Sequence, residues 1–389
     1  MRTTNLFILS IFSILLITSC SKSNTEEPPK EKQNDIAVVD NAVQKWMSDN
    51  TMPGLTLAVS KNGKLVYSKG YGLADKETSE KVTPETKFRI ASVSKLLTSV
   101  AIMKLVETGK ISMNQKVFGD GSILGTEYGT KPYKQYVTDI TVAHLLRHTT
   151  GGWGQANDPA FLDYNMKAGE VINYTLQNQL LTKAPGSSAD YSNFGYMLLA
   201  RIIEKASGKK YAAYVYDEIL SKVGATNTSI AGTSLTGRQV KEAKYYGQGG
   251  ETSFVYDNMN FERAEGAFGW ISTAPDLLRF TTAVDSSSTR PDILSLQTIK
   301  EMVTTTPASL WQGFHFGCGW VIENNEWFWW GSLPGTFAIL YRNGNGICIA
   351  AMANSRRQPD PNNGLYSFIP IINQIAFDAT IPWQDIDQF

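Results

Sequence analysis

The alternation of apolar and polar positions predicts a helix and a hairpin where the folded chain begins. Residues 36–47 space their apolar side chains as an amphipathic helix does. Two short apolar runs, 55–59 and 65–67, flank an Asn62–Gly63 turn, a sequence typical of β-hairpins. Over residues 91–108 the side chains are apolar on most faces of a helix, so we expect this helix to be buried.

A second region of strands follows a long middle segment that is rich in loops. Residues 116–264 contain isolated helical stretches such as 194–207. A helix is predicted over 276–285. Four apolar runs then read as strands: 317–322, 327–330, 337–342 and 346–352. This order predicts one sheet built from both ends of the chain, with a mainly helical lobe inserted between them.

The length of the chain supports a division into two lobes. At 389 residues it exceeds what one hydrophobic core usually serves. We expect an α/β lobe that combines about 36–115 with about 265–389, and a helical lobe over about 116–264. An apolar share of 42% excludes disorder for the bulk of the chain.

Charge and residue counts then exclude several classes of function. The 36 basic side chains are balanced by 36 acidic ones, so no positive excess is present for binding a nucleic acid. With 3 cysteines the chain cannot be a disulfide-built scaffold, and with 3 histidines it has few ligands for a metal site. We expect no metal and no cofactor. Cys318 and Cys348 could be free or bonded to each other.

The first residues are predicted to be an export signal. The apolar run Leu6–Ile17 follows Arg2 and is too short to span a bilayer, but it suits the core of a secretory signal. The residues up to Cys20 resemble a bacterial lipobox; the alternative is an ordinary signal peptide followed by a chance cysteine. We therefore predict a lipoprotein signal peptide over 1–19, lipid attachment at Cys20 and a flexible tether over 20–35. The protein would then lie in the bacterial cell envelope, on the periplasmic or surface side of a membrane, held there by the lipid alone.

The sharpest chemical signal is Ser92-x-x-Lys95 at the start of the buried helix. Side chains three residues apart share a helix face, so the hydroxyl and the amine can meet. A buried lysine has a lowered pKa and can take a proton from the serine, which makes the serine a nucleophile. The alternative is a first helical turn with a solvated lysine, but the apolar residues that follow Lys95 argue against full solvation.

Two further motifs follow in the chain. Tyr191-Ser192-Asn193 precedes a predicted helix, and its tyrosine can serve as an acid or a base. By itself the triplet could equally be a helix cap with a core tyrosine. The third motif runs from Trp329 to Thr336 and reads as a strand end followed by a turn.

In this order the three motifs resemble the serine β-lactamase and penicillin-binding-protein superfamily, in its class C-like branch. The resemblance implies a β-lactamase/transpeptidase-like fold of the α/β (α+β) class, with an antiparallel sheet flanked by helices. It also implies one catalytic domain over 36–389, with the active site between its two lobes. Further ordered matches to the family lie at 140–152, 185–186, 269–277 and 317–320.

The resemblance also implies a role for each motif residue. Ser92 would be the acylated nucleophile, with Lys95 as its base or proton relay and Tyr191 as a general acid or base. The residues do not decide which of the two is the base. Asn193 would contact the substrate and the polar network. The oxyanion hole would be formed by the backbone N–H groups of Ser92 and Ser332, and one such donor is worth about 2.7–4 kcal/mol.

The chain departs from the family pattern at Trp329, where a lysine or histidine usually stands two residues before Gly331. A lysine there would bind a substrate carboxylate, a contact worth about 1.5–3 kcal/mol. Covering roughly 100 Å² of indole gives ~2.5 kcal/mol, so apolar selectivity could replace anion selectivity. The W-x-G arrangement is similar to that of family VIII carboxylesterases. On a strand, Trp327 and Trp329 would share one face; we expect Trp320 and Trp330 to be core.

Three functions remain open from the sequence. The first is an exported serine hydrolase that acts through an acyl-enzyme on a small ester or amide. The second is a D-alanyl peptidase or β-lactamase acting on cell-wall-like peptides, which would need another cation: Arg147, Arg342 or Lys183. The third is a non-catalytic binding or sensor protein on the same fold.

Overall fold

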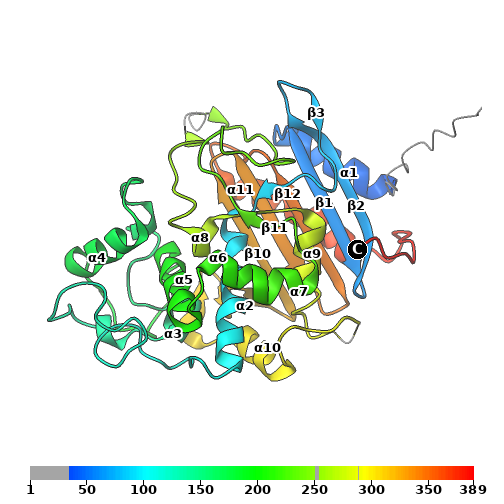
Figure 1. Cartoon of the computed structure of the whole chain (residues 1–389). Helices are drawn as coiled ribbons and strands as arrows, with labels where there is room; N and C mark the ends of the chain where they lie inside the picture. The colour runs from blue at the N-terminus through cyan, green and yellow to red at the C-terminus, as the bar shows by residue number, and fades with distance from the viewer. Residues whose placement is uncertain (1–34, 250–253, 288) are drawn as a thin grey trace, which may run out of the picture. The chain divides into compact units, whose positions relative to one another are not determined.

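The computed structural model describes residues 35–249, 254–287 and 289–389 (Figure 1). The predicted signal peptide, Cys20 and the tether as far as residue 34 lie outside these residues, so the lipid anchor stays a prediction. The part of the chain from residue 35 onward forms one compact unit. Within the described ranges, no helix is both long and apolar enough to cross a membrane.

A nine-stranded antiparallel sheet forms the centre of the described structure, in the order β3-β2-β1-β12-β11-β10-β9-β8-β7. The first and last long strands pair with each other along their length, from Leu55 opposite Ala353 to Lys61 opposite Ile347. Figure 1 shows this as blue strands lying beside orange ones. One sheet is thus built from both ends of the chain, as predicted. The strands are β1 (Gly54–Lys61), β2 (Lys64–Asp75), β3 (Glu80–Lys81), β7 (Leu310–Trp311), β8 (Phe314–Phe316), β9 (Val321–Glu323), β10 (Glu326–Leu333), β11 (Thr336–Arg342) and β12 (Ile347–Ala353).

The two faces of the sheet bury different helices. On β12, Ile349 and Ala351 face the cluster that contains helices α1 (Ala37–Asp49) and α11 (Pro361–Phe377), and Ala350 faces the opposite cluster. Every residue of β11 and β12 is buried, because both faces are covered. The apolar runs predicted for these strands are continuous for the same reason.

The second face packs against a helical layer centred on α2 (Ser94–Glu107). This helix contacts α5 (Asn193–Ser207) and α8 (Glu265–Phe268), and most of its side chains are buried. The other α-helices on the described residues are α3 (Val142–Leu146), α4 (Ala168–Asn178), α6 (Tyr211–Val215), α7 (Ser221–Val223), α9 (Ala274–Thr281) and α10 (Leu296–Val303). Short helical turns are η1 (Ala91–Val93), η2 (Val137–Asp139), η3 (Pro159–Phe161), η4 (Tyr216–Leu220, a π-helix) and η6 (Pro307–Ser309).

A second, three-stranded sheet is present besides the main sheet. Its order is β4-β6-β5, formed by β4 (Phe88–Arg89), β6 (Trp270–Ser272) and β5 (Ser229–Ile230). The antiparallel main sheet with helices on both faces confirms the α/β (α+β) fold class. The exact division into two lobes stays a prediction.

The predicted strand over 317–322 is wrong for its first four residues, which form a turn ahead of β9. Gly319 adopts φ +85° there, and a Cβ on it would lie 2.3 Å from Ser99 Oγ of α2. A tertiary contact therefore selects glycine and bends the chain. Cys318 lies in this turn rather than in a strand; it and Cys348 are buried free thiols.

Candidate active site

The short turn η1 presents Ser92 at the entrance to α2. Ala91, just before it, adopts φ +46°, a left-handed conformation that costs a non-glycine residue free energy and persists where the surroundings hold it. Strand β10 passes directly against this turn. A Cβ on Gly331 would lie 2.3 Å from the carbonyl oxygen of Ile90 and 2.9 Å from the amide nitrogen of Ser92, so only glycine fits. The predicted strand motif thus abuts the predicted nucleophile.

Two of the predicted side chains meet at the Ser92 hydroxyl, and a third joins them to each other. Ser92 Oγ lies 2.7 Å from the Tyr191 hydroxyl and 3.2 Å from Lys95 Nζ. The Asn193 side-chain oxygen accepts hydrogen bonds from Lys95 Nζ at 2.7 Å and from the Tyr191 hydroxyl at 3.3 Å. Residues about a hundred positions apart therefore form one polar network.

The Lys95 amine is fully buried and has three oxygen neighbours. It donates at 2.7 Å to Asn193 and at 2.8 Å to the carbonyl oxygen of Ala267, in α8. Its third neighbour is Ser92 Oγ at 3.2 Å. When the amine is neutral it has two N–H groups and one lone pair, so with both hydrogens on Asn193 and Ala267 the lone pair faces Ser92. Complete burial holds the pKa of Lys95 well below its usual range, although the charge of Asp158 acts in the opposite direction. Burial raises the pKa of Tyr191, so its phenol keeps its proton at neutral pH.

Asp158 is a member of this site that the sequence did not reveal. One of its carboxylate oxygens accepts from the backbone and side-chain N–H groups of Asn193, at 2.6 and 3.0 Å. The other accepts from the backbone N–H groups of Phe194 and Ala160, at 3.1 and 3.0 Å. Burial raises the pKa of Asp158, and these four N–H groups act against that rise. The carboxylate therefore fixes the Asn193 side chain that Lys95 contacts.

A pocket of about 290 Å³ opens at Ser92 and Tyr191. Its walls combine aromatic side chains with polar ones, among them Ser332 and Arg356. Arg356 donates to the Ser332 hydroxyl at 3.2 Å. The remaining described lining residues are Gln155, Trp311, Gln312, Phe314, Trp329, Trp330, Pro361, Asn362 and Tyr366.

Arg356 is a second site residue that the sequence did not reveal, and it replaces the three cations considered above. The described residues that line the pocket do not include Arg147, Arg342 or Lys183. Arg342 instead donates to the carbonyl oxygen of Asp285, and Lys183 donates to a serine hydroxyl. The arginine that lines this pocket is thus the one that follows β12.

Trp329 forms the floor of the pocket beneath Tyr191. It is 2% exposed, and its ring centre lies 5.7 Å from that of Tyr191 and 5.6 Å from that of Phe316. It therefore serves as both core and pocket wall. Trp320 is core as expected, but Trp330 is only partly buried and lines the pocket, so the expectation for Trp330 is wrong.

Two of the histidines accept a backbone hydrogen bond on a ring nitrogen. Nδ1 of His148 accepts from the backbone N–H of Ser192 at 3.1 Å, and Nδ1 of His144 accepts from the backbone N–H of Thr141 at 3.2 Å. Burial lowers the pKa of both rings. Across the three described ranges, no group of three or more His, Cys, Asp or Glu side chains is arranged to hold a metal ion.

Comparison with known proteins places this geometry in a known group. A family model described as Beta-lactamase matches residues 39–369. Protein flp of Staphylococcus aureus (strain N315) is 29% identical over 197 residues, which are 50% of this chain and 38% of that protein. The match thus spans well under half the length of that relative.

Two solved structures show the same fold. The octameric penicillin-binding protein homologue from Pyrococcus abyssi has a TM-score of 0.70 and 24% identity, over 87% of this chain and 77% of that one. The D-amino acid amidase from Ochrobactrum anthropi SV3, complexed with L-phenylalanine amide, has a TM-score of 0.68 and 23% identity, over 87% and 100%.

Proposed function

The chain belongs to the β-lactamase family, and from that premise we propose that it is a serine hydrolase that forms an acyl-enzyme on Ser92. The observation that supports this best is the buried Lys95 amine, which lies 3.2 Å from Ser92 Oγ and also bonds to two carbonyl oxygens, and whose pKa burial lowers. In the neutral form the lone pair of this amine faces the Ser92 hydroxyl, as an activated nucleophile needs. A binding protein on this fold would have no use for this arrangement.

The proposed reaction begins when neutral Lys95 takes the proton of Ser92. The oxygen attacks the substrate carbonyl carbon, and the negative charge that develops on the carbonyl oxygen is stabilised by the backbone N–H groups of Ser92 and Ser332. Tyr191 then gives its proton to the leaving oxygen or nitrogen, and the proton held by Lys95 replaces it. Water releases the acyl group by the same steps in reverse order.

We propose small esters or amides with an apolar or aromatic group as the substrates. Trp311, Trp329 and Trp330 give the pocket apolar walls, which favour such groups. The amidase with the similar fold was solved with an aromatic amino acid amide, which is consistent with this class. Turnover of short-chain nitrophenyl esters that disappears in Ser92→Ala tests the proposal; full turnover in that variant would overturn it.

A second candidate is a D-alanyl peptidase or β-lactamase activity. Arg356 favours it, because a guanidinium at the Ser332 side of the pocket can bind a substrate carboxylate. Parallel assays with nitrophenyl butyrate, nitrocefin and a D-alanyl-D-alanine peptide separate the two candidates. Hydrolysis of nitrocefin or the peptide without ester turnover would favour the second. A fluorophosphonate that fails to label Ser92 would favour the third possibility, a non-catalytic protein.

We further propose that the protein is exported and lipid-anchored in the cell envelope, through Cys20. This proposal rests on the sequence of residues 1–20 alone. Fatty-acid labelling of the full chain in a bacterial host, with Cys20→Ser as the comparison, tests it. Equal labelling of both forms, or of neither, would contradict the anchor.

A further inference from the structure

An apolar cavity of about 210 Å³ lies between helix α11 and the sheet face that this helix covers. Phe328 and Ile339 line it from the sheet, and Leu365, Ile369 and Ile372 line it from the helix. None of these five side chains carries a polar atom, and they form an apolar stretch of the lining; polar groups are contributed by Tyr341 and Asn373 and by two glutamates.

This cavity is adjacent to the Ser92 pocket. Phe314, Trp330 and Tyr366 line both spaces. Trp330 is only partly buried and Tyr366 is 54% exposed, so this shared wall lies at the protein surface. The ring centres of Phe314 and Trp330 are 6.1 Å apart.

The alternation along β10 gives the direction and length of the path. The partly buried positions of this strand share one face, while Trp329 and Gly331 are buried on the opposite side; the partly buried ones are Glu326, Phe328, Trp330 and Ser332. From Ser332 to Phe328 is four residues, or about 13 Å. An extended hydrocarbon chain covers about 13 Å in roughly ten bonds.

Charge fixes which end of a ligand enters the cavity. The far rim carries Glu323 and Glu326, and no lysine or arginine occurs among its described lining residues. The Ser92 end carries Arg356. The reacting carbonyl must lie at Ser92, and the two glutamates disfavour a carboxylate at the far rim, so the hydrocarbon end is the one that enters the cavity.

Resting on the hydrolase function proposed above, we propose that this cavity binds the unbranched acyl chain of the substrate. The substrates would then be esters or amides of medium-chain acids of about eight to ten carbons. Each methylene buried raises kcat/KM roughly fourfold at most.

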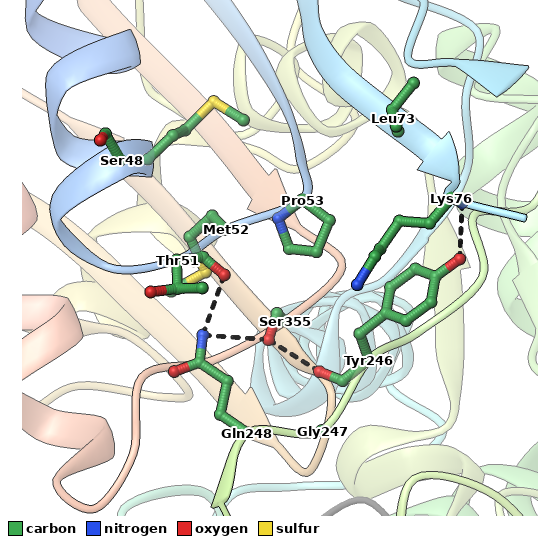
Figure 2. A pocket seen from close by; sticks show the side chains of 11 residues that line it. Ser48, Thr51, Met52, Pro53, Leu73, Lys76, Tyr246, Gly247, Gln248 and Ser355 are labelled. Atoms are coloured by element: carbon green, nitrogen blue, oxygen red, sulfur yellow. Dashed lines mark hydrogen bonds between the residues drawn. The ribbon is translucent and has the colours of Figure 1, made fainter. Parts of the chain in front are cut away.

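A larger cavity, of about 390 Å³, carries no such inference. It lies between the end of α1 and the end of β2, and several of its polar groups bond to one another (Figure 2). Gln248 donates to the carbonyl oxygen of Thr51 at 3.1 Å and to Ser355 Oγ at 3.3 Å. Ser355 in turn donates to the carbonyl oxygen of Tyr246. These groups are therefore engaged in holding segments of the chain together.

The test is a series of nitrophenyl esters from acetate to decanoate with three variants of the purified protein. In Ile369→Trp the cavity is filled, and kcat/KM for the octanoate should fall about tenfold or more while that for the acetate is unchanged. Val38→Trp is the matched control, because Val38 and Ile369 are both aliphatic and both 39% exposed, and it should keep the parent profile. Ile369→Ala enlarges the cavity and should move the chain length with the highest kcat/KM to longer acyl chains. This variant tests the inference even if the tryptophan variant does not fold.

A parent profile that is flat or falls with chain length would overturn the inference, as would equal changes in Ile369→Trp and Val38→Trp. In that case acetate turnover and labelling of Ser92 would remain, and the proposed hydrolase function would stand. Absence of turnover for every ester, together with an unlabelled Ser92, would instead remove the proposed function and the inference that rests on it.

Discussion

Asp158→Asn removes the carboxylate that holds the polar network together while keeping the shape of the side chain. An asparagine has one carbonyl oxygen, which can keep two of the four N–H donors. Its amide nitrogen must then face the other two, which are either the pair on Asn193 or the pair on Ala160 and Phe194. Either orientation leaves two donors without an acceptor in a buried site.

The expected cost follows from these contacts. A hydrogen bond to a charged acceptor contributes about 1.5–3 kcal/mol, so the loss of two lowers the free energy of unfolding by about 3–6 kcal/mol. At roughly 2 °C per kcal/mol for a chain of this size, Tm should fall by about 6–12 °C. Asp163→Asn is the matched control, because that exposed carboxylate accepts from only the backbone and side-chain N–H groups of Asn165, both at 3.0 Å.

The catalytic effect is separated from the loss of stability by the pH profile of kcat/KM, measured well below Tm. Burial lowers the pKa of Lys95, and the negative charge of Asp158 opposes that effect. Removing the charge should lower the pKa of Lys95 further. The neutral amine then persists to lower pH, and the acid limb of the profile shifts to lower pH. An Asp158→Asn protein with the Tm and the pH profile of Asp163→Asn would refute the reasoning.

Three further predictions concern the remaining parts of the site. Because only the neutral amine of Lys95 can accept a proton, kcat/KM should rise with pH through its lowered pKa, and Lys95→Met should lose about 10²–10⁴ in kcat/KM; a profile without an acid limb contradicts this. Gly331→Ala places a Cβ 2.9 Å from the amide nitrogen of Ser92 and should abolish labelling of Ser92 by a fluorophosphonate in a protein with an unchanged circular dichroism spectrum; normal labelling counts against the close packing of β10. Arg356→Gln should lower kcat/KM about 10- to 150-fold for substrates with a free carboxylate and leave neutral esters unaffected; equal losses for both would exclude a carboxylate-binding role.

Local chemistry explains what the sequence could predict. The Asn62–Gly63 turn joins two strands and helps to set their register. A few neighbouring residues are therefore enough to predict the hairpin. The three-residue spacing of Ser92 and Lys95 places both on one helix face whatever the rest of the chain does. The pairing of the first strand with the last followed from the order of the apolar runs.

The missed features depend on contacts between distant segments. Asp158 precedes a proline, a local sign of a helix cap, but two of its four donors come from Asn193, 35 residues later. Arg356 lies in the loop after β12 and reaches the site only because β10 lies two strands away. The turn at Gly319 was read as a strand because its requirement for glycine comes from Ser99, more than two hundred residues earlier.

The most direct test of the central claim is the intact mass of the purified protein after brief exposure to a nitrophenyl ester. The account predicts a mass increase of one acyl group, located on Ser92 by peptide mapping, slow to decay at low pH and absent from Ser92→Ala. An unmodified protein that still turns over the ester, or an acyl group located on another residue, would contradict an acyl-enzyme at Ser92.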